Sequence, residues 1–163
     1  MNWRVYWHED LGQPVEMDET EKTKAALAGA YRLDEQVGFL LRRASQRHLA
    51  IFTRRIPGLT SMQFATLAKL KEAGALSQNA LGRLTAMDAA TIKGVVDRLG
   101  KRGLVMTEND KTDRRRTIVS LTDAGREIID GLEGGALQVS EETLAPLSSS
   151  EQAIFLHILR KLT

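Results

Sequence analysis

The stretch KTDRRRTIVSLT, residues 111–122, places three consecutive arginines directly in front of a run with β-strand character. That run alternates apolar and polar residues and is rich in β-branched side chains, which is typical of a half-buried strand. The segment LVMTE, residues 104–108, alternates in the same way, and the polar NDKTDR between the two runs supplies turn formers. The two runs predict one β-hairpin, which must pack on other elements to be stable.

Three short helices are predicted before this hairpin. The first begins at TSMQ, residues 60–63, a capping-box pattern, and stops at Gly74. Ser77 caps a helix through Leu84, and Asp88 caps another that ends near residues 102–103. Short helices joined by turns of this length are typical of a helix-turn-helix, and a hairpin that follows at once makes it a winged helix.

Longer helical patterns flank this region. Apolar residues recur at spacings of three and four from Ala25 to Arg55, and further helices are predicted from Thr122 to about Glu142 and after SSSE, residues 148–151. We therefore expect a mainly α-helical protein with a small β-hairpin wing, whose flanking helices form an assembly surface. Residues 1–24 are expected to be an N-terminal arm, either docked on a partner or frayed at the terminus.

Composition and charge narrow the function. The 163 residues suit one domain of ordinary soluble composition, and neither a membrane span nor a signal peptide is recognisable, so a cytoplasmic protein is expected. Cysteine is absent, the three histidines lack metal-site spacing, and no Gly-rich phosphate loop occurs. We therefore expect no enzyme, no metal and no cofactor. Residues 93–116 hold eight basic and four acidic side chains, the footprint of a polyanion partner.

The helix after Asp88 has two different faces. Ile92, Val95, Val96 and Leu99 share one, and the opposite face carries Ala90, Lys93, Gly94, Asp97 and Lys101. Small residues on an outward face permit the close approach that a DNA major groove requires. The alternative is that Gly94 packs against a neighbouring helix. Asp97 would repel DNA unless Arg98 or a wing arginine neutralises it.

Candidate DNA contacts come from three places. Thr91 and Lys93 stand where recognition helices usually meet bases or phosphates, and Ser77 opens a helix whose amides favour a phosphate, although such residues also serve as ordinary caps. The wing arginines suit a narrow minor groove, but adjacent strand residues alternate, so one or two reach DNA and another pairs with Asp113. Taken alone, the arginines could also be a solvated run. The predicted DNA-binding set is Ser77, Gln78, Asn79, Ala90, Thr91, Lys93, Gly94, Arg98, Lys101, Arg114, Arg115 and Arg116.

The wing segment from Asp113 to Thr122 resembles the MarR family of bacterial transcription regulators, whose wing pattern is D-x-R-x-x-x-[LV]-x-L-T. The following Asp-Ala-Gly and the segment VVDRLGKRGLV, residues 95–105, are similar to that family as well. The resemblance covers about residues 30–162. It implies dimerisation helices at 25–58 and 123–163 around a winged helix-turn-helix at 59–122.

The resemblance also implies a function. Members are homodimers that bind double-stranded, pseudo-palindromic operator DNA, mostly as repressors released by small, often aromatic, anionic ligands. Asp113 and Arg115 fall on the wing's aspartate and arginine, and Ala90, Thr91 and Lys93 fall on the recognition helix. The alternative function is a winged-helix module that binds another protein and no DNA.

An aromatic-acid effector is implied by residues 40–52, LLRRASQRHLAIF, which are similar to the branch of the family that senses aromatic carboxylates. There an arginine and a histidine six residues later hold the carboxylate, and Arg42 and His48 match that spacing. Positions six apart lie about 120° apart on an ideal helix, so joint binding requires both side chains to curl into one pocket. In the alternative reading Arg42 pairs across the dimer and His48 belongs to a core.

Overall fold

A computed structural model describes Thr20 and residues 31–113 and 115–163, in a chain that divides into two compact units, residues 1–42 and 43–163. In the first unit a 3-10 helix, Leu33–Glu35, precedes the start of helix α2, Val37–Arg55, and extended backbone at Gln36 separates them. The single helix predicted from Ala25 to Arg55 is therefore wrong over residues 31–36, where the 3-10 helix has no buried residue to hold it by packing. Residues 25–30 and the predicted arm, apart from Thr20, lie outside the described residues.

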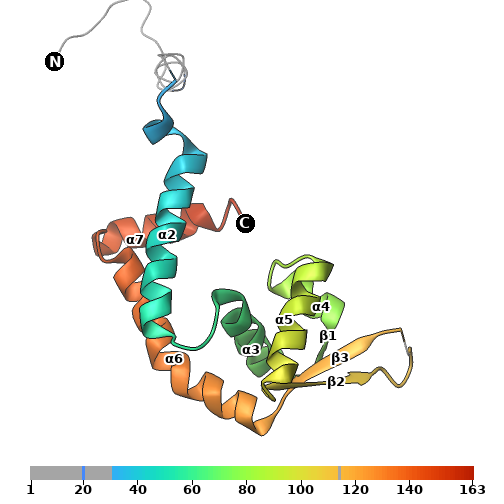
Figure 1. Cartoon of the computed structure of the whole chain (residues 1–163). Helices are drawn as coiled ribbons and strands as arrows, with labels where there is room; N and C mark the ends of the chain where they lie inside the picture. Colours follow the sequence, from blue (N-terminus) through green and yellow to red (C-terminus); the bar gives the residue numbers. More distant parts are fainter. Residues whose placement is uncertain (1–19, 21–30, 114) are drawn as a thin grey trace, which may run out of the picture. The chain divides into compact units, whose positions relative to one another are not determined.

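The second unit contains the predicted order of elements (Figure 1). After the remainder of α2 come α3 (Ser61–Ala73), β1 (Leu76–Ser77), α4 (Gln78–Leu84), α5 (Ala89–Lys101), β2 (Val105–Asn109), β3 (Thr117–Leu121), α6 (Asp123–Leu144) and α7 (Ser149–Leu159). A helix-turn-helix, α4 and α5, is followed directly by the β2–β3 hairpin. This order confirms the predicted winged-helix fold class.

From α3 to α6 the helices begin where the capping signals of the sequence predict them. Thr60 Oγ1 accepts a hydrogen bond from Gln63 N at 3.2 Å while Gln63 Oε1 accepts from Thr60 N at 3.0 Å, which completes the capping box of α3. Glycines end two segments in the left-handed region, Gly74 at φ 75° and Gly103 at φ 70°. The N-caps predicted at Ser77, Asp88 and Thr122 all accept a backbone N–H from three residues ahead.

The sheet has three strands rather than the two that were predicted. Strand β3 lies in the centre and pairs antiparallel with β2, where Val105 faces Leu121, and with β1, where Leu76 faces Val119. Strand β1 is only two residues long, so it shows no alternation that a sequence pattern could reveal. It ties the chain before α4 to the base of the wing.

One continuous core supports the helix-turn-helix and the wing. The predicted inner face of α5 is fully buried at Ile92, Val95, Val96 and Leu99. It packs in one cluster with residues of α3, of the sheet and of α6, among them Leu67, Leu70, Val119 and Ile129. The recognition helix is thus held from its inner side by apolar packing, which leaves the outer side to solvent or a partner.

Two kinds of contact fix α6 against the rest of the second unit. At its start, Thr122 Oγ1 donates to Gly103 O at 2.6 Å and accepts from Gly125 N at 3.0 Å, and Thr122 N donates to Leu104 O at 3.2 Å. A Cβ on Gly125 would overlap the Leu104 carbonyl oxygen, so only glycine fits this junction. Near its end, Arg55 forms an ion pair with Glu142.

The turn of the wing is organised by an aspartate that the sequence analysis did not single out. Asp110 Oδ1 accepts from Thr112 N at 2.8 Å and from Thr112 Oγ1 at 2.6 Å, while Asp110 N donates to Arg116 O at 2.9 Å. The Thr112 hydroxyl and then its amide lower the pKa of the Asp110 carboxyl. Asp113 has the predicted structural role, because its Oδ1 accepts from Arg115 N at 3.1 Å.

We expect Gly125→Ala to lower the free energy of unfolding by about 2 kcal/mol or more, because the new methyl group must push Leu104 away. Gly134→Ala is the matched control in the same helix, since a Cβ there meets nothing within 4 Å. That control should be neutral or stabilising by about 0.5 kcal/mol. Urea unfolding of both variants measures the difference, and equal stability of the two would contradict the junction described above.

We expect the wing turn to lose order as the pH falls below about 4, the usual range of an aspartate. The pKa of Asp110 is lowered in the folded chain, so its contribution is present above the unfolded pKa and disappears as the pH falls through the folded one. Amide hydrogen exchange at Thr112 measures this order. In Asp110→Asn, the exchange at Thr112 should be faster near neutral pH and no longer depend on this titration; a wild-type pH profile in that variant would contradict the assignment.

Candidate nucleic-acid interface

The turn between α4 and α5 sets the direction of the recognition helix. Met87 N donates to Gly82 O at 2.8 Å, and Ala86 adopts a left-handed φ of 53°, unusual for a residue with a side chain. A Cβ on Gly82 would lie 3.1 Å from Ile92 Cγ2, so this glycine lets α4 approach α5 closely. The angle between the two helices therefore depends on small residues in α4 and the turn.

Asp88 holds the first turn of α5. Its Oδ1 accepts from Thr91 N and its Oδ2 accepts from the Thr91 hydroxyl, both at 2.8 Å. These two hydrogen bonds, first that of the amide and then that of the hydroxyl, lower the pKa of the Asp88 carboxyl. The hydrogen of the Thr91 hydroxyl is thus used within the cap, so Thr91 can only accept a hydrogen bond from a donor on a DNA base.

The outward face of α5 is open, as its small residues predicted. Ala90, Lys93 and Asp97 are exposed, and Lys93 Nζ lies 2.6 Å from Asp97 Oδ2. Asp97 is thus paired with the lysine one turn earlier on the same helix, a partner that the sequence analysis did not consider beside Arg98 and the wing arginines. An exposed pair of this kind contributes little stability, so Lys93 can exchange Asp97 for a phosphate.

Gly94 does not pack against a neighbouring helix. A Cβ at this position would meet only the guanidinium of Arg98, with the nearest nitrogen at 3.4 Å. That group is the flexible end of a side chain on the same helix, so it can move aside for a larger residue at position 94. The nearest atoms to such a Cβ therefore belong to Arg98 and not to a neighbouring helix, which argues against the helix-packing alternative for Gly94.

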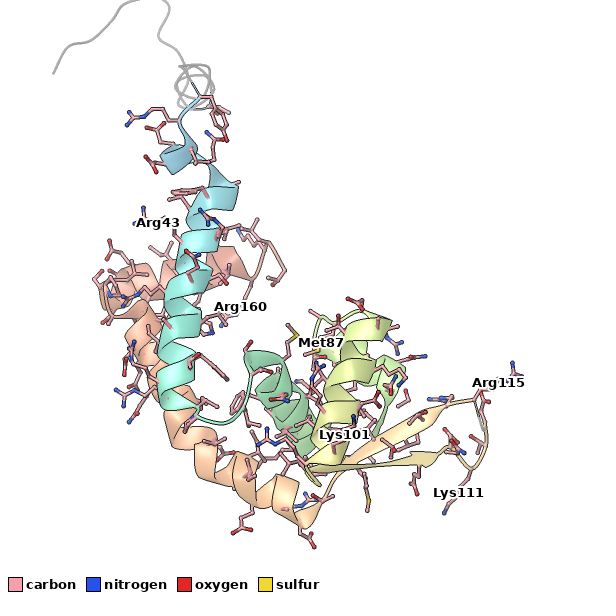
Figure 2. All side chains as sticks on the ribbon, in the orientation of Figure 1. Arg43, Met87, Lys101, Lys111, Arg115 and Arg160 are labelled. Carbon is pink, nitrogen blue, oxygen red and sulfur yellow. The ribbon has the colours of Figure 1, made fainter. Side chains whose placement is uncertain are left out.

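The start of α4 and the wing enclose a cleft of about 450 Å³. It is lined by Ser77, Gln78, Asn79, Arg83, Arg115, Arg116 and Thr117. The structure therefore brings together the residues predicted at the start of α4 and two of the predicted wing arginines. Lys101, by contrast, lies at the other end of α5 and does not line the cleft (Figure 2).

Arg83 is the one cationic residue of this cleft that the sequence analysis missed. It lies four residues after Asn79 in α4, so both side chains share a helix face. The four-residue spacing between Asn79 and Arg83 is visible in the sequence, so Arg83 could have been predicted together with Asn79. Three guanidinium groups on one cleft make a site for phosphate oxygens, because each can donate two parallel hydrogen bonds.

The wing arginines differ in how they are held. Arg115 lies at the tip of the wing, its side chain 97% exposed and its Nε 3.9 Å from Asp113 Oδ1 (Figure 2). Arg116 is less exposed, and its guanidinium lies 3.8 Å from Asp110 Oδ2. Arg114 lies outside the described residues. Arg115 is therefore the more loosely held of the two and extends furthest from the helical core.

The two effector candidates lie in different units of the chain. Within the first unit, the guanidinium carbon of Arg42 stands 5.1 Å from the centre of the Phe39 ring, a cation–π contact. Within the second unit, His48 is half-buried and its Nδ1 lies 3.1 Å from Thr143 Oγ1. Each residue thus has an identified neighbour of its own.

The described residues were also compared with what a metal site and a membrane span require. In residues 31–113 and 115–163, no group of three or more histidine, aspartate or glutamate side chains could hold a metal ion. None of the described helices is long and apolar enough to cross a membrane.

Comparison with known proteins agrees with this geometry. The family model described as MarR family matches residues 59–117, which include the helix-turn-helix and most of the wing. The HTH-type transcriptional repressor NicR of Pseudomonas putida is 46% identical over 134 residues, which cover 81% of this chain and 85% of NicR.

Two solved structures are similar over most of the chain. A probable transcriptional regulator from Pseudomonas aeruginosa is 52% identical with a TM-score of 0.77, covering 81% of this chain and 100% of that one. BpsR of Bordetella bronchiseptica, whose DNA binding is regulated by 6-hydroxynicotinic acid, is 41% identical with a TM-score of 0.79, covering 82% and 97%. With its winged helix, its cationic cleft and these relatives, the chain belongs to the MarR family of DNA-binding transcriptional regulators.

Proposed function

We propose that this regulator is a cytoplasmic repressor that binds a pseudo-palindromic operator as a homodimer and leaves it when a small aromatic carboxylate binds. The observation that carries the DNA-binding part is the cleft lined by Arg83, Arg115 and Arg116 beside the open face of α5. A recognition helix in the major groove would place such a wing over the flanking backbone. In this proposal Ala90 and Gly94 face the bases, and Lys93 and the residues of the cleft hold phosphates.

Exposed apolar residues on α7 support the homodimer. This helix has no buried residue in the single chain, although half of its side chains are apolar. Ile154 is 59% exposed, Ile158 is 51% exposed and Phe155 is 42% exposed. Apolar side chains repeated along one helix are stabilised when a second surface covers them. Two copies joined there would present two winged helices to the two halves of an operator.

Two observations support an aromatic carboxylate as the effector. The DNA binding of BpsR, 41% identical to this chain, responds to 6-hydroxynicotinic acid. In the present chain Arg42 supplies a guanidinium, which suits a carboxylate, and His48 is a half-buried polar side chain on the same helix, α2. We propose these two residues as effector contacts.

Removal of one wing charge tests the DNA interface. We expect Arg115→Ala to weaken binding to DNA from upstream of its own gene and to reduce the slope of log affinity against log salt by about 1, because one phosphate contact is lost. Arg160→Ala removes the same charge from the C-cap of α7, remote from the wing (Figure 2), and should leave both quantities unchanged. Fluorescence anisotropy titrations at several salt concentrations measure them. Equal effects of the two substitutions would contradict the wing contact.

A bulky residue on the open face of α5 tests insertion into the groove. We expect Gly94→Leu to fold at least as stably as the wild type, because leucine favours helices and only the flexible Arg98 is near. The same variant should lose operator binding by about 100-fold or more, since the side chain would separate the helix from the bases. Circular dichroism and gel-shift titration measure the two outcomes. Wild-type operator affinity in a folded Gly94→Leu would exclude close approach at this face.

Effector release is tested with charged and neutral aromatic compounds. We expect 6-hydroxynicotinate or a related acid to release bound DNA and to raise the melting temperature of the free protein. Arg42→Ala should lower the affinity for that acid by about tenfold or more, because a charge-assisted hydrogen bond is lost, and should retain DNA binding. If only neutral amides release the DNA, the carboxylate proposal is wrong.

A further inference from the structure

The hydroxyl of Thr143 constrains which nitrogen of His48 carries a hydrogen. Thr143 Oγ1 lies 2.7 Å from Val139 O, to which it donates. A hydroxyl has one hydrogen, so the same oxygen can only accept from a further partner. That partner is His48 Nδ1, 3.1 Å away, which is an N–H donor as long as the Thr143 hydroxyl donates to Val139 O.

This donor assignment leaves the other ring nitrogen as an acceptor. A neutral imidazole carries a single hydrogen, and with that hydrogen at Nδ1 the Nε2 atom presents a lone pair. The opposite tautomer would require the Thr143 hydroxyl to donate to Nδ1 and so to give up its hydrogen bond to Val139 O. Both side chains are half-buried and Val139 is buried, so water does not readily replace the lost hydrogen bond.

We propose that Thr143 is a positioning residue that keeps His48 in the Nδ1–H form, so that the effector site selects aromatic acids that also carry a ring hydroxyl or ring N–H. This inference rests on the proposed contact between His48 and the effector. A carboxylate has no hydrogen to offer to the Nε2 lone pair of a neutral imidazole, whereas a hydroxyl or lactam N–H donates to it. In this proposal His48 therefore contacts the donor group of the ligand, rather than the carboxylate that the family resemblance implied for it.

The tautomer can be measured without any ligand. Long-range 1H–15N spectra distinguish the protonated from the unprotonated nitrogen of a neutral imidazole, and comparison with His48→Gln assigns the signals among the three histidines of the chain. At about pH 8.5, above the ordinary titration range of histidine, we expect His48 in the Nδ1–H form. In Thr143→Ser, His48 should stay in the Nδ1–H form. In Thr143→Val, which has no hydroxyl, the Nε2–H form of His48 should become populated as well. A wild-type His48 in the Nε2–H form would overturn the proposal.

The selectivity is measured with matched pairs of acids. Calorimetric titrations compare 6-hydroxynicotinate with nicotinate and 4-hydroxybenzoate with benzoate. We expect the wild type and Thr143→Ser to prefer the donor-bearing member of at least one pair by about fivefold or more, the value of one hydrogen bond. Thr143→Val should reduce that preference to less than about twofold. An undiminished preference in Thr143→Val would overturn the role of Thr143.

The two measurements also separate this inference from the proposed function. If the Nδ1–H form is found but no acid binds any variant, the proposed effector contact of His48 fails, and with it the selectivity. If acids bind and release DNA but benzoate and nicotinate bind as well as their hydroxylated partners, the proposed function stands and this inference is overturned. If Thr143→Val does not fold, the wild-type spectrum and the Thr143→Ser titrations still decide both points.

Discussion

The close approach of Gly125 to the Leu104 carbonyl is the constraint on which the DNA-binding half of the second unit depends. At this point the chain leaves the recognition helix, turns at Gly103, completes the wing and starts α6. Thr122 joins these parts, since it donates to the Gly103 and Leu104 carbonyls and accepts from the Gly125 amide. The orientations of α5, the wing and α6 are therefore coupled through a few backbone groups. A side chain at residue 125 would separate all three.

On the outward face of α5 and on the wing, three basic side chains each lie near an aspartate. Lys93 lies against Asp97, Arg116 lies near Asp110, and Arg115 lies near Asp113. The Lys93–Asp97 and Arg115–Asp113 pairs are largely exposed, so each contributes little to folding and is easily exchanged for a phosphate, whereas Asp110 is mostly covered. The carboxylates keep the basic side chains apart in the free protein, and the wing turn depends on Asp110 and Asp113 through backbone N–H groups as well. The structural and electrostatic roles are thus carried by the same aspartates.

Much of the fold was predictable because its signals are local. Caps at Thr60 and Asp88, the glycine stop at Gly103 and the buried face of α5 each depend on residues within a turn or two of one another. Strand β1 was missed because two residues carry no period, and the 3-10 helix before α2 was missed because an apolar spacing does not show whether anything covers it. The MarR fold and family were correctly predicted from the wing motif.

The site was less predictable than the fold, because its contacts join distant segments. The cleft between α4 and the wing depends on β1 pairing with β3, and no sequence pattern predicts that pairing. The same holds for the partner of His48, which lies 95 residues away at Thr143. Lys93 was named as a candidate contact, but its ion pair with Asp97 was overlooked in favour of an arginine. Sequence spacing identifies side chains of the right kind more readily than it identifies what they touch.

Helix α6 joins the wing junction at one end to Thr143 near the other without a break. Its 22 residues span about 33 Å along the helix axis. A tilt of about 5° around the Thr143 end would displace the Gly125 end by about 2 Å. The proposed effector contact at His48 and the wing junction therefore lie against the two ends of one helix.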